Sequence, residues 1–190
     1  ILLVMLSAAY TIGLEWKRDT QLVLYRISGN SPLTALMGKL LPQTLVFWLI
    51  YILYAVYFYR YLQYPCNSGI MAMIGVGMLT VLGAQGFATF LFGVSGQMRL
   101  SMCLCSLWGI LSFSLAGFTY PVTAMDPILQ KLSVLFPLRH YYLLYVNQAL
   151  NGYSIAYAWH SVLALAKFAL LPLLTLHHYR SLFTKVKYIP

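Results

Sequence analysis

The sequence predicts an all-α polytopic membrane protein with about five transmembrane helices, the first of them truncated. Hydrophobic residues make up 61% of the chain and charged residues only 8%, whereas soluble domains carry about 25% charged residues. Apolar runs of about 20 residues, the length needed to cross a bilayer, recur along the chain. Lipid allows only helices or closed barrels to span it, and these runs lack the alternation of barrel strands.

The predicted elements form one transmembrane domain over residues 1–190. Residues 1–14 are too short to span a bilayer alone, so we expect them to be the end of a span that begins in a longer protein. A charged segment over 15–30 follows. We then expect spans over 32–61, 70–92, 101–118 and 155–178, short outer re-entrant helices over 119–152, and a cytoplasmic tail over 179–190.

The orientation follows from the basic residues, which are more frequent on the cytoplasmic side of membrane proteins. If residues 15–30 are cytoplasmic, alternation of the spans places more bases inside than outside. The inside set is Lys17, Arg18, Arg26, Lys39, Arg99, Arg180, Lys185 and Lys187, and the outside set is Arg60, Lys131 and Arg139. We therefore expect a multi-pass protein of the plasma membrane, which in a bacterium is the inner membrane.

The charged segment is predicted to contain an amphipathic helix at the cytoplasmic surface, over residues 15–28. Trp16, Val23 and Ile27 would share its apolar side, and Lys17 and Arg18 would reach water. Gly29-Asn30 is a plausible stop, because both residue types tolerate the left-handed conformation. Ser31 and Pro32 then suit the N-cap and first position of the next helix.

The second unusual segment lies between the predicted spans 101–118 and 155–178. It is too polar and too often interrupted by proline to cross the membrane. Pro127–Phe136 and Leu138–Leu150 are still apolar enough for two short helices. We expect these helices to dip into the outer leaflet or to cap the bundle.

Sites for chemistry are not predicted in this chain. Gly38-Lys39 suggests a phosphate-binding loop, but that motif needs Gly at 33 and Ser or Thr at 40, where this chain has leucines. Three acidic residues provide no convergent catalytic or metal-binding set, so we expect no cofactor here. If ATP and Mg are used, another chain binds them. The bases are scattered between apolar runs, which argues against nucleic acid despite the net charge of +9.

Two groups of residues could instead line a substrate path. Lys167 is the one base predicted in mid-bilayer, where an ionisable group suggests function; the alternative is a lysine packed in the bundle. Tyr51, Tyr54 and Phe58 share a helix face and could also line a path, or could serve in packing and an aromatic belt. A face of small residues on the span 70–92 indicates close helix packing, within the chain or between subunits.

Two segments together resemble the permeases of type-2 ABC exporters. "EWKRDT" at 15–20 and "SPLTALMGKLLP" at 31–42 resemble the family's cytoplasmic segment and entrance to the next span, with Asp19 replacing a glycine. "LAGFTYPVTAMDPILQKLSVLFPLRHYYLL" at 115–144 resembles the segment after the fifth span. Ala116 stands there where serine is usual, and Asp126 separates Met125 from Pro127.

The resemblance implies a six-span permease that works as a dimer, homomeric or heteromeric, with an ABC ATPase subunit. It implies that residues 15–30 form the coupling helix, with Glu15, Lys17, Arg18 and Asp19 as candidate contacts to the ATPase. The expected function is export of a substrate driven by ATP hydrolysed in a separate subunit. An ion-coupled secondary transporter and a membrane-embedded lipid-modifying enzyme are the alternatives.

Overall fold

The computed structural model describes residues 1–185 of the chain, and all regular elements within them are helical. Four helical stretches are long and apolar enough to cross a membrane: Pro32–Tyr61, Ile70–Ser95, Met98–Leu115 and Ala156–Phe183. The predicted class, an all-α polytopic membrane protein, is confirmed. In chain order the α-helices are α1 (Leu2–Lys17), α2 (Gln21–Ile27), α3 (Pro32–Val56), α4 (Ile70–Ser95), α5 (Met98–Leu115), α6 (Pro127–Ser133), α7 (Pro137–Tyr145), α8 (Trp159–Leu170) and α9 (Pro172–Lys185).

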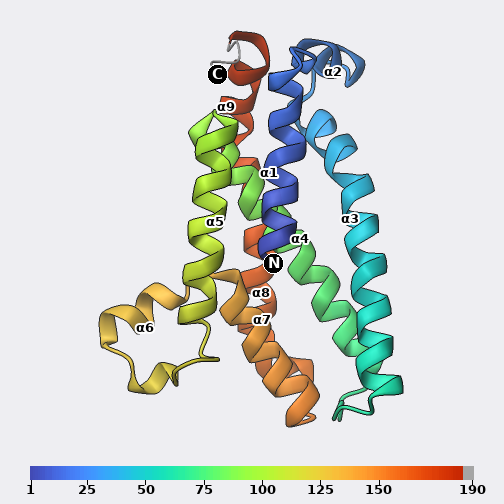
Figure 1. The fold of residues 1–190 in the computed structure, drawn as a ribbon, viewed down its shortest axis with the longest axis vertical. Coiled ribbons are helices and arrows are strands. Elements are labelled where there is room, and N and C mark those ends of the chain that lie inside the picture. The colour runs from blue at the N-terminus through green and yellow to red at the C-terminus, as the bar shows by residue number, and fades with distance from the viewer. Residues whose placement is uncertain (186–190) are drawn as a thin grey trace.

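The bundle has two distinct ends (Figure 1). The α2 end carries α2, the beginning of α3, the turn between α4 and α5, and the end of α9. The α7 end carries α6, α7 and the loop after α3. Short helical turns complete this end: η1 (Tyr57–Tyr61), η2 (Val122–Ala124), η3 (Val146–Leu150) and η4 (Ile155–Ala158). This separation is the one expected from alternating spans.

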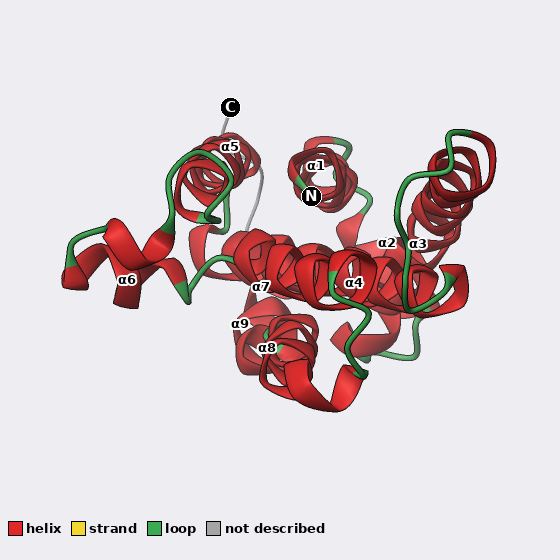
Figure 2. Ribbon diagram, turned by 90° about the horizontal axis from the view of Figure 1, so that it is seen from below, coloured by secondary structure: helices red, strands yellow, loops and turns green. Residues whose placement is uncertain are grey.

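The core is organised around α4. Seen from the α7 end, α4 lies between α1 and α3 on one side and α8 and α9 on the other (Figure 2). In the most apolar 18-residue stretch of α4, 56% of the residues are buried within the chain. In the corresponding stretch of Pro32–Tyr61, only 6% are buried. Its small residues permit this: a Cβ on Gly86 would lie 2.4 Å from the carbonyl oxygen of Phe168. Gly86 therefore packs within the chain against α8, whereas Gly77, on the same helix, packs against Tyr51 of α3.

Local signals explain where α3 and α6 begin. Ser31 is the N-cap of α3 and Pro32 its first residue, as the sequence predicts. Gly29 and Asn30 before it have φ of 66° and 59°, which confirms the expected left-handed stop after α2. At α6, the Asp126 carboxylate accepts a hydrogen bond from the Ile128 N–H, 2.9 Å away.

The structure differs from the sequence prediction at the last span. That span is two helices, because Leu171 interrupts the run and α9 begins at Pro172, which has no N–H to continue the ladder. The helix also continues past the predicted end at 178 and reaches Lys185. The rest of the predicted tail, including Lys187, lies outside the described residues.

Candidate functional site

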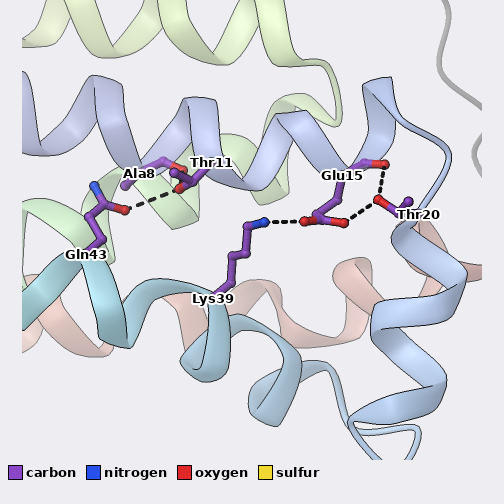
Figure 3. Close-up of polar contacts among 6 residues, drawn as sticks. All are labelled: Ala8, Thr11, Glu15, Thr20, Lys39 and Gln43. Atoms are coloured by element: carbon purple, nitrogen blue, oxygen red, sulfur yellow. Dashed lines mark hydrogen bonds and ion pairs between the residues drawn. The ribbon is translucent and has the colours of Figure 1, made fainter.

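The α2 end contains a polar contact that joins three segments (Figure 3). Lys39 on α3 donates a hydrogen bond and forms an ion pair with the Glu15 carboxylate near the end of α1. The Thr20 hydroxyl, in the turn before α2, donates to the other carboxylate oxygen. Glu15 thus holds α1, the turn and α3 together, although it and Lys39 are 24 residues apart.

The carboxyl group of Glu15 is ionised more easily than an ordinary one. Its partial burial would by itself raise the pKa, because desolvation disfavours the charged form. The hydrogen bonds from Lys39 and Thr20, together with the positive charges of Lys39 and Arg18, outweigh that effect and hold the pKa below its usual value. The negative charge of Glu15 is therefore part of the folded structure.

A second contact lies one turn further into the bundle (Figure 3). The Thr11 hydroxyl is 3.2 Å from the Gln43 Oε1 and 3.0 Å from the Ala8 carbonyl oxygen. Thr11 and Glu15 are four residues apart on α1, as are Lys39 and Gln43 on α3, so the two contacts are successive rungs between helices. They fix the position of the start of α3 against α1.

The prediction of one helix over residues 15–28 was wrong, because a turn divides this segment between α1 and α2. Helix α1 continues to Lys17, and α2 begins only at Gln21. Lys17, Arg18 and Asp19 are exposed at this turn rather than on the water-facing side of one helix. Asp19 has φ of 53°, in the left-handed region that glycine favours.

Helix α2 has one buried side and one exposed side. Gln21 and Tyr25, one turn apart, are buried, and the Tyr25 ring stacks on Phe183 of α9 with 5.5 Å between ring centroids. The exposed side, which we call the α2 face, consists of Leu22, Val23, Arg26 and Ile27. It combines three apolar side chains and one cation.

The expected apolar side of this segment was partly wrong. Trp16 does not share a face with Val23 and Ile27, because it belongs to α1 and only 3% of it is exposed. Its ring packs against Phe92 of α4 and Phe183 of α9, at centroid distances of 5.2 and 5.0 Å. The α2 end is therefore held by an aromatic cluster on the α9 side and by the Glu15–Lys39 pair on the α3 side.

The aromatic residues predicted for a substrate path line two cavities near the α7 end. Tyr51 and Tyr54 line both cavities, of about 310 and 340 Å³, and Phe58 lines only the second. The Tyr51 ring lies directly on Gly77: a Cβ added to this glycine would be 1.9 Å from Cε1 of Tyr51. The Tyr51 hydroxyl donates a hydrogen bond to the Met73 carbonyl oxygen, 3.1 Å away. Tyr54 is largely exposed.

Lys167 is separate from these aromatic residues. It lines a different cavity, between α7 and α8, with Arg139, His140 and His160. The alternative interpretation required Lys167 to be packed inside the bundle of this chain. Its side chain is instead exposed. The structure thus divides the four residues predicted for one path between two regions.

Two groups of functional candidates became apparent only in the structure. Val23 and Ile27 were expected on the apolar side of the segment and Arg26 among the cytoplasmic bases, but Leu22 was not named and the four were not recognised as one exposed face. The buried pair Gln21 and Tyr25, four residues apart, marks the opposite side of α2. Arg139 and His160 were not connected with Lys167, because nothing in the linear sequence shows that α7 and α8 pack together. Among the described residues no group of three or more His, Cys, Asp or Glu could hold a metal ion.

Taken together, the apolar spans and the polar, clamped α2 end define a multi-pass α-helical membrane protein. The family described as "ABC-2 family transporter protein" matches residues 1–176. The chain therefore belongs to the ABC-2 transporter family, and it is a permease component of an ABC transporter. No curated protein and no solved structure matches the chain.

Proposed function

We propose that this chain is the membrane-spanning subunit of an ATP-driven exporter and that the α2 end, on the cytoplasmic side, docks on a separate ABC ATPase. The observation that carries the proposal is the α2 face. Val23 and Ile27 are 57% and 80% exposed beside Arg26, at the end of the bundle where bases are concentrated. Exposed apolar side chains next to a charge suit a protein contact, in which the charge fixes orientation.

The connections of α2 supply a route by which movement of an ATPase would reach the membrane. A displacement of α2 acts on α1 and α3 through Glu15, Thr20 and Lys39, and on α9 through Tyr25 and Phe183. Packed helices respond to such a displacement as rigid bodies. ATP and Mg would be bound by the ATPase, and Lys17, Arg18 and Asp19 would lie at the edge of the contact.

The translocation path in this proposal passes the aromatic cavities of Tyr51, Tyr54 and Phe58. Both cavities are lined by α3, and the one of about 310 Å³ is also lined by α1. These are the two helices that the Glu15–Lys39 pair joins at the α2 end. The complete exporter would contain a second permease copy, identical or related, in the plasma membrane. Its substrate would meet aromatic rings and phenolic hydroxyls on the α3 side of this subunit.

Cysteine cross-linking to the cognate ATPase tests the docking proposal. In a variant without Cys66, Cys103 and Cys105, single cysteines at Val23 and Ile27 should cross-link to the ATPase, with a yield that changes on addition of ATP. Cysteines at Ser68 and Lys131, which belong to the α7 end, serve as controls. They should not cross-link, and an impermeant thiol reagent should label them from outside the cell.

Two results would contradict the proposal. Absence of cross-links from the whole α2 face, with and without ATP, would mean that α2 is only a surface helix. Labelling of position 23 from outside would place the α2 end on the wrong side of the membrane. In the same system Ile27→Asp should lower substrate-stimulated ATP hydrolysis at least about tenfold if Ile27 is a central contact, since such contacts contribute about 2 kcal/mol or more.

A further inference from the structure

Four basic side chains surround the cavity between α7 and α8, which has a volume of about 600 Å³. Arg139 and His140 come from α7, and His160 and Lys167 come from α8. We call this cavity the basic cavity. Helix α8 lies on the opposite side of α4 from α1 and α3 (Figure 2). Helix α7 lines both the basic cavity, through Arg139 and His140, and the aromatic cavities, through Tyr141.

The chain has no acidic side chain available to the basic cavity. Its three acidic residues all lie elsewhere: Glu15 pairs with Lys39, Asp19 is in the turn before α2, and Asp126 caps α6. Within residues 1–185, the acceptor of the Arg139 guanidinium is a neutral one, the Gln130 carbonyl oxygen at 3.3 Å. The positive charge around the cavity therefore needs a counter-charge from outside the chain.

The geometry of α8 directs its two bases toward the α7 end. His160 and Lys167 are seven residues apart, or about two turns and 10 Å, so they lie on the same side of the helix. Helical side chains lean toward the helix N-terminus, which for α8 is the α7 end. The long Lys167 side chain can therefore bring its ammonium group toward His160 and Arg139, near the level of a headgroup region.

His140 adds a polar group that the protein leaves unsatisfied. Only 7% of the residue is exposed, and its Nε2 is 2.9 Å from the Val134 carbonyl oxygen. The buried Nδ1 has no hydrogen-bond partner among the described residues. A buried ring nitrogen without a partner is costly, and a hydroxyl of a bound molecule would remove that cost.

Apart from Ser161, the rest of the cavity lining is apolar or aromatic. Its walls include Leu143, Leu163, Phe168 and Leu171, and Trp159 stands half-exposed beside His160. A small soluble anion would satisfy the charges but leave these walls unused. A molecule with an anionic headgroup and a hydrocarbon chain matches both parts, and Trp at this position is typical of a membrane interface.

We propose that the basic cavity binds the phosphate headgroup of an anionic amphiphile from the surrounding bilayer, with Arg139 and Lys167 as its counter-charges. The phosphate oxygens accept charge-assisted hydrogen bonds from the guanidinium and ammonium groups. The acyl chains lie along Leu163, Phe168 and Leu171. The site needs neither ATP nor an ATPase, so it stands or fails independently of the proposed export function.

Thermal unfolding of the purified chain in a neutral detergent tests this site. Added phosphatidylglycerol should raise the unfolding temperature more than the same amount of zwitterionic phosphatidylcholine. In Lys167→Gln and Arg139→Gln the phosphatidylglycerol concentration needed for half the effect should rise about fivefold each, the loss expected for one base at an anionic lipid surface. Lys167→Arg should keep the effect.

Lys131→Gln is the matched control, because Lys131 is an exposed base near the same end of the bundle but does not line the basic cavity. It should respond to phosphatidylglycerol like the unmodified protein. Inorganic phosphate at matched concentration tests for a free anion: equal stabilisation by phosphate alone would overturn the assignment to an amphiphile.

Native mass spectrometry of the same proteins gives a second measurement that does not depend on unfolding. We expect one retained phosphatidylglycerol molecule in the unmodified chain and in Lys131→Gln, and loss of that molecule in the double variant Arg139→Gln, Lys167→Gln. Equal retention by the double variant, or no preference of the unmodified chain for phosphatidylglycerol over phosphatidylcholine, would refute the proposal.

Discussion

Lys39 and Lys167 are both single lysines within apolar helices, but the fold gives them opposite surroundings. Lys39 meets the carboxylate of Glu15 and becomes part of the joint between α1 and α3. Lys167 is exposed beside three other bases and meets no acid. The chain contains only three acidic residues, so the placement of those few carboxylates decides which bases are structural and which remain free to bind something else.

The largest difference should appear when both lysines are replaced by methionine. Lys39→Met leaves the partly buried Glu15 without its cation, so it should lower the free energy of unfolding by about 1–3 kcal/mol. Lys167→Met removes no hydrogen bond or ion pair with another of the described residues and should change that free energy by less than about 0.5 kcal/mol. Unfolding in neutral detergent with increasing dodecyl sulfate measures both. Equal losses would contradict the distinction between the two lysines.

A double-mutant cycle isolates the contact between Glu15 and Lys39. If the pair interacts directly, Glu15→Gln and Lys39→Met should be non-additive by about 1 kcal/mol, within the range measured for side chains in contact. The same cycle with Glu15→Gln and Lys167→Met should be additive, because the two side chains lie at different places in the bundle. Additivity in the first cycle would mean that Glu15 owes its position to Thr20 alone.

Acid should weaken the same joint. Because the pKa of Glu15 is lowered in the folded chain, its contribution to stability is complete above the pKa of an unfolded glutamate, about 4.3. It is lost as the pH falls through the lower, folded pKa. The free energy of unfolding should be measured between about pH 3 and 6, a range around that pKa, for the unmodified chain and for Glu15→Gln. Only the unmodified chain should show the additional loss of stability in acid. If the stabilities of the two proteins change with pH in parallel, the ionisation of Glu15 does not contribute to the stability of the joint.

The smallest effect concerns the turn between α1 and α2. Asp19 has positive φ, so Asp19→Gly should stabilise the chain by about 0.5 kcal/mol through relief of backbone strain, reduced by the greater entropy of unfolded glycine. Asp19→Ala, which keeps the strain and removes the carboxylate, should be less stable than Asp19→Gly. The same dodecyl sulfate titration resolves the order of the three proteins, and the reverse order would exclude strain at this position.

The spans could be predicted from sequence because a long apolar run in lipid has few alternatives to a helix. The α2 segment was harder, because charged residues such as Glu15 and Lys17 suggested a boundary although α1 continues through them. Glu15 is stabilised there by Lys39, and no pattern within residues 15–28 reveals that partner. Lys167 stood out alone, whereas Arg139 and His160 gained meaning only once α7 and α8 were packed together.

The shallow burial of α3 has a consequence for how the protein is assembled. Beyond the Glu15 joint, α3 is attached to α4 through separate hydrogen bonds, from Thr44 to the Gln85 Oε1 at 2.7 Å and from Trp48 to the Met78 carbonyl oxygen at 3.2 Å. An apolar cavity of about 400 Å³ lies beside it. During biogenesis such a helix can enter the bilayer as an independent hydrophobic segment and join the finished bundle late.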